Sequence, residues 1–153
     1  MELTYQEFTT IKEEILNPLF EVNNEVFSEF TTPFDKEKLQ NTARKVDGLH
    51  IVLAYQGEQV VGFKAGYRHS LRRFYSWLGG VKKDFRGHGI AKELMRRQHQ
   101  FAKNEGYSII ETRTKNMFQN MIITNLKAGF HIVGTTVSIG DSEPVLILEK
   151  ILD

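Results

Sequence analysis

The sequence predicts an α/β protein of the α+β type, in which a mixed, mostly antiparallel sheet of about seven strands is flanked by about four helices. Short apolar runs bounded by turn residues recur along the chain and are typical of strands. Between them lie stretches whose apolar residues are three or four apart, which indicates helices. A length of 153 residues suits one domain with a proper core, so we expect residues 1–153 to form a single domain.

The N-terminal segment is expected to form one strand and then a helix. Residues 3–7 are a short strand candidate. Residues 11–30 have helical spacing, although Pro18 is expected to break or start a helix within that stretch. The apolar positions that carry this spacing are Leu19, Val22, Val26 and Phe30.

A second helix and three strands follow. Residues 36–46 fit a helix with Asp35 as its N-cap. Residues 49–55 are apolar and indicate a strand, which a turn connects to a second strand at residues 59–67. A further strand is expected at residues 74–82.

The second half of the chain contains the clearest helix. It begins near Ile90 with an apolar stripe and ends before Gly106, as expected for a glycine after a helix end. A strand at residues 107–113 and a helix at residues 116–127 come next. Residues 130–138 and 145–152 are expected to close the fold as a hairpin. The predicted order is therefore β-α-α-β-β-β-α-β-α-β-β.

The most informative segment is Arg86-Gly87-His88-Gly89-Ile90-Ala91, between a strand and the clearest helix. Glycines at a helix start leave backbone N–H groups free to bind an anion, most often a phosphate. Gly87 and Gly89 are required there either for close backbone approach or for a positive φ angle. Arg86 can add charge-assisted hydrogen bonds. The segment predicts a binding site for a phosphorylated ligand.

Two other phosphate-binding motifs are excluded by single positions. A P-loop needs Lys and then Ser or Thr after its last glycine, whereas Ile90 and Ala91 follow Gly89. A dinucleotide fingerprint needs Gly or Ala where Lys92 stands.

The remaining pattern, Arg-x-x-Gly-x-Ala, resembles the pyrophosphate-binding motif of the GCN5-related N-acetyltransferase (GNAT) family. Its place after the fourth strand and before the third helix agrees with the family, as does Gly129-Phe130 after the last helix. The resemblance covers residues from about 49 to the C-terminus. It implies an acyl-CoA N-acyltransferase-like fold and acetyl-CoA-dependent transfer to a primary amine of a small molecule or peptide.

The resemblance also implies roles for individual residues. The backbone N–H of Val81 would polarise the thioester carbonyl. Two glycines in the preceding strand mark a bulge or a close backbone approach, where the pantetheine arm of the cofactor would pair with the strand. The implied cofactor-binding residues are Gly79, Gly80, Val81, Arg86, Gly87, His88, Gly89, Ile90, Ala91, Asn116, Asn120 and Asn125.

The last helix departs from the commonest pattern of the family. Many members carry a Tyr that protonates the leaving thiolate, and here Asn125 holds that position, with Met121 four residues earlier. Some members share this pair, and Asn125 can still donate a hydrogen bond to the sulfur. The substitution also motivates an alternative function, a non-catalytic acyl-CoA-binding or sensing module. Asn116 has a structural alternative as a helix N-cap.

A general base is needed because the attacking amine must lose a proton. Glu111 is one candidate, with a solvent-facing strand position as its alternative role, and Tyr75 and Ser76 are others. The chain has no cysteine, so we expect direct transfer within a ternary complex.

Composition and net charge limit the kinds of binding partner that we expect. The net charge of +1 gives no case for nucleic acid or membrane binding, and the five histidines lack metal-ligand spacing, so no metal is expected. We expect a cytoplasmic protein, with a homodimer as one assembly to test. The row Glu21, Glu25 and Glu29 is either a solvated helix face or an attractor for a cationic acceptor.

Overall fold

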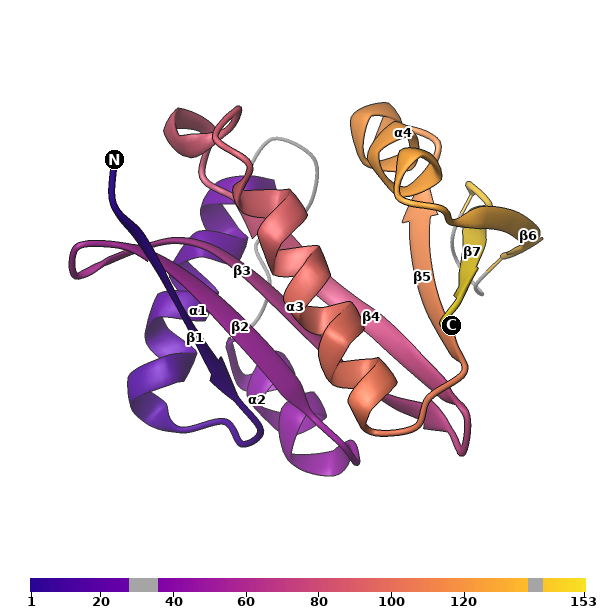
Figure 1. Cartoon of the computed structure of the whole chain (residues 1–153), viewed down its shortest axis with the longest axis horizontal. Coiled ribbons are helices and arrows are strands. Elements are labelled where there is room, and N and C mark those ends of the chain that lie inside the picture. Colours follow the sequence, from indigo (N-terminus) through magenta and orange to yellow (C-terminus); the bar gives the residue numbers. More distant parts are fainter. Residues whose placement is uncertain (28–35, 138–141) are drawn as a thin grey trace.

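The computed structural model describes residues 1–27, 36–137 and 142–153. Their strands form one seven-stranded sheet in the order β1-β2-β3-β4-β5-β7-β6 (Figure 1). All neighbouring strands are antiparallel except β4 and β5. The strands are β1 (Leu3–Phe8), β2 (His50–Gln56), β3 (Gln59–Ser70), β4 (Arg73–Val81), β5 (Ile109–Lys115), β6 (His131–Thr136) and β7 (Val145–Ile151).

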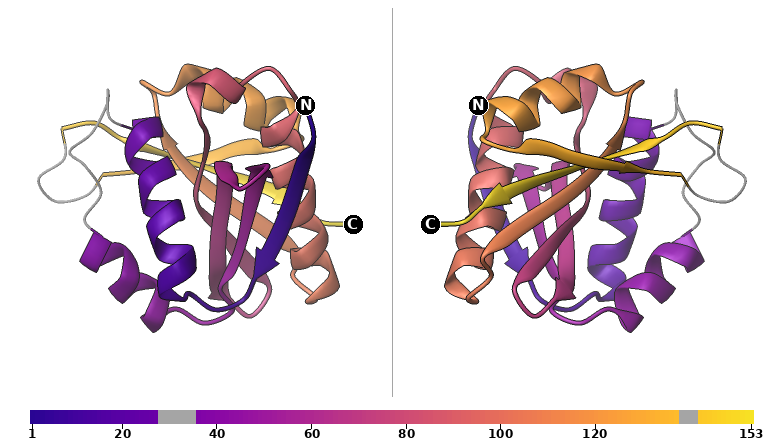
Figure 2. Two further views of the ribbon diagram at one scale, coloured as in Figure 1. Left: turned by 90° about the vertical axis from the view of Figure 1, so that its left-hand side faces the viewer. Right: turned by 90° about the vertical axis from the view of Figure 1, so that its right-hand side faces the viewer.

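Helices cover both faces of the sheet, with α1 and α2 on one face and α3 on the other (Figure 2). On the first face, Leu16 and Leu19 pack into a core with Phe63. On the second face, Ile90 and Leu94 pack against the strands. The helices are α1 (Glu13–Phe27), α2 (Lys36–Lys45), α3 (Ile90–Asn104) and α4 (Gln119–Lys127). The predicted fold class and element order are confirmed.

The expectation for Pro18 is wrong, because α1 is continuous across it. A proline inside a helix costs about 3 kcal/mol. Burial of one leucine stabilises by about 1.5–3 kcal/mol, so Leu16 and Leu19 together offset that cost. The expected roles of Phe30 and Asp35 lie outside the described residues.

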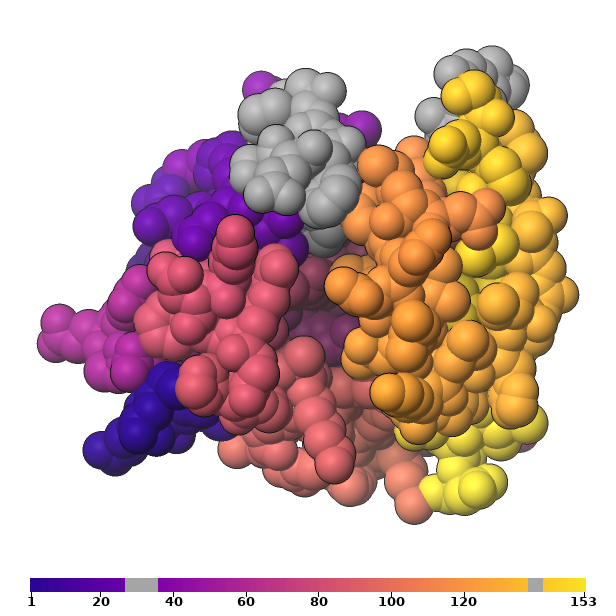
Figure 3. All heavy atoms as spheres, turned by 90° about the horizontal axis from the view of Figure 1, so that it is seen from above, coloured from indigo at the N-terminus to yellow at the C-terminus, as the bar shows by residue number. Residues whose placement is uncertain are grey.

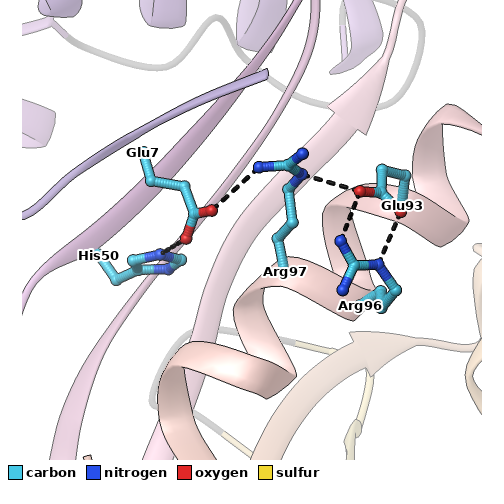
Figure 4. A network of polar contacts seen from close by, with 5 residues as sticks. All are labelled: Glu7, His50, Glu93, Arg96 and Arg97. Carbon is cyan, nitrogen blue, oxygen red and sulfur yellow. Dashed lines mark hydrogen bonds and ion pairs between the residues drawn. The ribbon is translucent and has the colours of Figure 1, made fainter. Parts of the chain in front are cut away.

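A network of charged side chains attaches α3 to the edge of the sheet (Figure 4). Glu7 of β1 accepts hydrogen bonds from Arg97 of α3 at 3.2 Å and pairs with the buried His50 of β2 at 2.8 Å. Arg97 and Arg96 also bind Glu93, and their hydrogen bonds lower the pKa of Glu93 to about 2. The network fixes the position of α3 against β1 and β2.

The two halves of the sheet separate between β4 and β5 (Figure 1). These strands pair only from Arg73 to Ser76 of β4, whereas β5 pairs with β7 along its whole length. The register between β3 and β4 skips Trp77, which is a β-bulge immediately after the last residue paired with β5. A bulge bends its strand and increases its twist. The bulge expected in this strand therefore lies at Trp77 and not at Gly79 and Gly80.

The closing hairpin of β6 and β7 is confirmed, but its second strand lies inside the sheet. β7 pairs with β5 on one side and with β6 on the other. The edge strand at this end of the sheet is therefore β6, which precedes β7 in the chain.

Candidate active site

A cleft of about 750 Å³ opens where β4 and β5 separate. Its walls come from β4, β5, the start of α3 and α4, and Figure 3 shows the hollow between the loop before α3 and α4. Seven residues predicted for the site line this cleft: Gly79, Gly80, Val81, Arg86, Ala91, Asn120 and Asn125. Segments far apart in sequence are thus brought to one place.

The free edge of β4 supplies backbone hydrogen-bonding groups to the cleft. The N–H of Lys82 donates to the Val61 carbonyl of β3 at 2.9 Å. Because N–H groups alternate between the two edges of a strand, those of Val81 and Gly79 face the opposite edge. Beyond Ser76 no β5 residue pairs with that edge. This is the orientation that the predicted role of Val81 requires.

The two glycines of β4 differ in what surrounds them. A Cβ on Gly80 would lie 2.7 Å from Cγ1 of Val26, so α1 approaches the strand too closely for a side chain. A Cβ on Gly79 would make only ordinary contacts, 3.4 Å from Cγ of Lys64. The predicted close approach is therefore present at Gly80, and it is an approach of helix α1.

The loop before α3 presents free backbone donors. Among the described residues, no backbone carbonyl accepts a hydrogen bond from the N–H groups of residues 87–91. Gly87 and Gly89 have φ angles of 81° and 80°, and a Cβ on either would meet nothing within 4 Å. A positive φ, rather than crowding, explains both glycines. His88 lies exposed between them, and Ile90 contributes its N–H while its side chain is buried.

Arg86 has two structural tasks at this loop. Its Nε donates a hydrogen bond to the Val81 carbonyl at 3.1 Å, which connects the loop to the end of β4. Its own backbone N–H donates to the Lys83 carbonyl at 3.3 Å, so the row of free donors begins at Gly87 rather than at Arg86. The guanidinium still lines the cleft, where it adds positive charge.

The three asparagines differ in position. Asn125 is buried on α4 and faces the cleft, and Asn120 lines it from an exposed position one turn earlier. Asn116 is exposed and does not line the cleft, and α4 begins only at Gln119 with Phe118 as its N-cap. The alternative of Asn116 as a helix cap is therefore wrong. Met121 lines the cleft, and the Thr114 hydroxyl donates to its sulfur at 3.9 Å.

Glu111 is buried on β5 and does not line the cleft, so its alternative as a solvent-facing position is wrong. Its carboxylate accepts hydrogen bonds from Arg73 at 3.4 Å and from Arg113 at 3.1 Å. Of the other two candidates, Ser76 lines the cleft and Tyr75 does not. Burial raises the pKa of Tyr75, which makes it a poorer acid.

Two glutamates of the acidic row on α1 lie near a lysine of the same chain. Glu25 and Glu21 lie 3.4 Å and 3.8 Å from the ammonium of the buried Lys82. Glu29 lies outside the described residues. Glu21 and Glu25 therefore have an ion-pair partner within this chain.

Two cleft residues carry chemistry that the sequence analysis missed. Lys64 lines the cleft from β3, and its signal is a lysine within the apolar run from Val60 to Gly66. Trp77 lines the cleft from the bulge, and its ring lies 5.7 Å from that of Tyr67. No local pattern marks a bulge residue. In the described part of the chain, no three His, Asp or Glu residues are grouped to hold a metal ion. No described helix is long and apolar enough to cross a membrane.

Comparison with solved structures confirms the fold. The ribosomal-protein-S18-alanine N-acetyltransferase from Escherichia coli matches with a TM-score of 0.82 at 10% identity, covering 99% of this chain and 95% of the other. Ard1 from Thermoplasma volcanium gives 0.82 at 18% identity, covering 99% and 98%. The PaiA N-acetyltransferase from Thermoplasma acidophilum, solved in complex with coenzyme A, gives 0.76 at 17% identity, covering 99% of both chains.

Comparison with family models identifies the class. Residues 14–121 match the model of the acetyltransferase (GNAT) family, whereas no curated protein matches the chain. The matched range includes β4, the loop before α3 and β5, and it ends within the first turn of α4. The chain belongs to the GNAT family of acetyltransferases and is an enzyme of that class. Enzymes of this family use acetyl-CoA and act on amine substrates.

Proposed function

We propose that this enzyme transfers the acetyl group of acetyl-CoA to a primary amine of a small molecule or peptide. The observation that carries the proposal is the separation of β4 from β5 directly beside the free N–H groups of residues 87–91. One cleft thereby offers a long unpaired strand edge and, at its end, an anion-binding loop. A phosphorylated ligand with an extended amide-containing arm fits this combination.

The donor would be held by backbone groups. The N–H groups of Gly87, His88, Gly89, Ile90 and Ala91 bind its pyrophosphate, supported by the positive end of α3, which contributes roughly 0.3–1 kcal/mol at an exposed site. The free edge of β4 at Gly79 pairs with the amides of the pantetheine arm. Asn120 and Asn125 face the arm from α4. Asn116 does not line the cleft, so it would contact only the outer part of the donor.

Transfer would occur directly between the two substrates. The amine nitrogen attacks the thioester carbon, a C–N bond forms, and the C–S bond breaks as the thiolate leaves. The Val81 N–H stabilises the negative charge that develops on the carbonyl oxygen. Asn125 donates a hydrogen bond to the sulfur, which suffices because a thiol has an ordinary pKa of about 8.5. With no cysteine in the chain, no thioester of the protein intervenes.

Glu111 fits a positioning role better than that of a base. Its carboxylate oxygens are occupied by two guanidinium groups, and its side chain does not line the cleft. One of these groups belongs to Arg113, which lines the cleft. We therefore assign Glu111 the task of orienting Arg113. The single domain, the homodimer and the cytoplasmic location stay predictions.

The test is a thermal-shift titration with acetyl-CoA, CoA, ATP and NAD, followed by thiol release with a panel of amines. A ligand at a hundred times its Kd stabilises by about 2.7 kcal/mol, which is easily measured. We expect stabilisation by acetyl-CoA and CoA, and thiol release with at least one amine. A shift with ATP or NAD but with neither CoA form would refute the donor assignment, and binding without release for any amine would favour the sensing module.

A further inference from the structure

Lys64 occupies an unusual position for a lysine. It lies between the fully buried residues Phe63 and Ala65 in the middle of β3, and its side chain points to the α3 face. It crosses β4 over Gly79, where a Cβ would lie 3.4 Å from its Cγ and 3.5 Å from its Nζ. The missing side chain of Gly79 thus leaves the space that Lys64 uses to reach the cleft.

No negative charge accompanies this ammonium group. Among the described residues, no carboxylate lies within 4.0 Å of its Nζ. Lys82, which is buried directly after the end of β4, has Glu25 at 3.4 Å and Glu21 at 3.8 Å. Burial without a partner lowers the pKa of Lys64 from its ordinary 10.5 to about 8.

The groups that face Lys64 do not replace the missing charge. On α3, the charges of Lys64 and Lys150 help to lower the pKa of His99 to about 3, so His99 is neutral. Lys150 of β7 lies 3.4 Å from the His99 Nδ1 and is itself a cation. Gln98 of α3 is fully buried, and neither atom of its amide has a hydrogen-bond partner. On β4, Gly79 presents no side chain.

Lys64 is therefore a ready nucleophile. Near pH 8 about half of its amine is neutral, roughly a hundredfold more than for a lysine of ordinary pKa. A neutral amine that lines the cleft beside Gly79 lies two residues along β4 from Val81, where the thioester carbonyl of a bound donor is expected. A half-buried amine of lowered pKa that lines a cleft without a counter-charge is typical of a functional site rather than of a structural role.

We propose that Lys64 is an internal acetyl acceptor, modified by the acetyl-CoA bound in the cleft of the same molecule. This inference rests on the proposed donor site. The Nζ lone pair attacks the thioester carbon, the C–N bond forms and the C–S bond breaks. CoA leaves as the thiolate, which takes up the proton that the amine nitrogen releases. The product is a neutral amide beside Gly79, and its bulk weakens the binding of the next donor molecule.

The experiment uses the full chain with acetyl-CoA at pH 8, with and without an excess of CoA as competitor. Intact mass spectrometry counts the acetyl groups, and peptide mapping locates them. We expect Lys64 to be acetylated before Lys82 and before the exposed Lys103, and excess CoA to suppress the reaction at Lys64 alone. Lys64→Arg should lose that site while still being stabilised by CoA.

The outcomes separate this inference from the proposed function. Stabilisation by acetyl-CoA with no acetyl group on Lys64 would overturn the inference and leave the donor site intact. If Lys64 is acetylated no faster than Lys103 and excess CoA does not slow the reaction, Lys64 reacts with acetyl-CoA from solution. That result would overturn the inference. Absence of both stabilisation and modification would overturn both proposals. Lys64→Gln serves as a second variant if Lys64→Arg does not fold, which circular dichroism would show.

Discussion

Gly80 of β4 and Val26 of α1 are in such close contact that a Cβ on the glycine would lie 2.7 Å from Cγ1 of the valine. The contact seats the C-terminal half of α1 on the strand that borders the cleft. It explains why this strand carries a glycine on the α1 face.

Gly80→Ala should destabilise the protein by about 1–3 kcal/mol, because α1 must move to admit the methyl group. Gly79→Ala is the matched control, since its Cβ would make only contacts of 3.4 Å or more. Urea unfolding of the two variants checks this. Equal losses of stability would show that strand propensity, not the contact with Val26, dominates.

Gly89→Ala should weaken acetyl-CoA binding by about ten- to a hundredfold, which corresponds to one or two lost hydrogen bonds to a charged group. Alanine disfavours the φ of 80° at Gly89, so the donor N–H groups would turn. Gly57→Ala is the control, because Gly57 has a φ of 61° and equally open surroundings in the β2–β3 turn. Isothermal titration calorimetry should find full affinity in that control, and a similar loss in both would contradict a specific role of the loop.

Glu7→Gln should destabilise the fold by about 1–2 kcal/mol, because Glu7 accepts charge-assisted bonds from Arg97 and pairs with the buried His50. Chemical unfolding provides the measurement, and Glu2→Gln, at an exposed position before β1, is the control. Equal free energies of unfolding for the two variants would mean that the network in Figure 4 adds no net stability.

Stability should fall as the pH decreases below about 6.5, partly because of His99. Burial first, and then the charges of Lys150 and Lys64, lower the pKa of His99 in the folded protein to about 3. Between these two values the unfolded chain binds one more proton, so stability declines with falling pH by at most about 1.4 kcal/mol per unit. His99→Gln should reduce the slope between pH 6.5 and 5, and thermal unfolding across that range checks it. An unchanged slope would assign the pH dependence to other groups.

Lys64→Met should stabilise the protein at pH 7 by about 1–3 kcal/mol, because it removes a half-buried ammonium group that has no carboxylate beside it among the described residues. Unfolded Lys64 keeps its proton up to pH 10.5, whereas folded Lys64 loses it near 8. The stability of the unmodified chain therefore rises between about pH 8 and pH 10.5, and the difference in stability between it and the Lys64→Met variant becomes smaller. Lys82→Met should instead destabilise, since it removes the ion pairs of the buried Lys82 with Glu21 and Glu25. A Lys64→Met variant less stable than the parent at pH 7 would contradict the unpaired state of Lys64.

Local patterns in the sequence predicted the order of the helices and strands and the free backbone N–H groups of the loop before α3. The apolar spacing of α3 and the glycines at its start are patterns among residues close together in the chain, so they can be recognised without a structure. Pro18 was misjudged because a local helix-breaking preference was outweighed by the burial of Leu16 and Leu19 against the sheet.

The fold class and the candidate loop at residues 86–91 can therefore be recognised from local patterns in the sequence. What that loop faces depends on contacts between distant elements. The place of β7 between β5 and β6, the separation of β4 from β5 after Ser76, and the passage of Lys64 over Gly79 all join residues distant in the chain. The physical reason is that these features follow from packing and pairing between elements, which no local spacing of residues encodes.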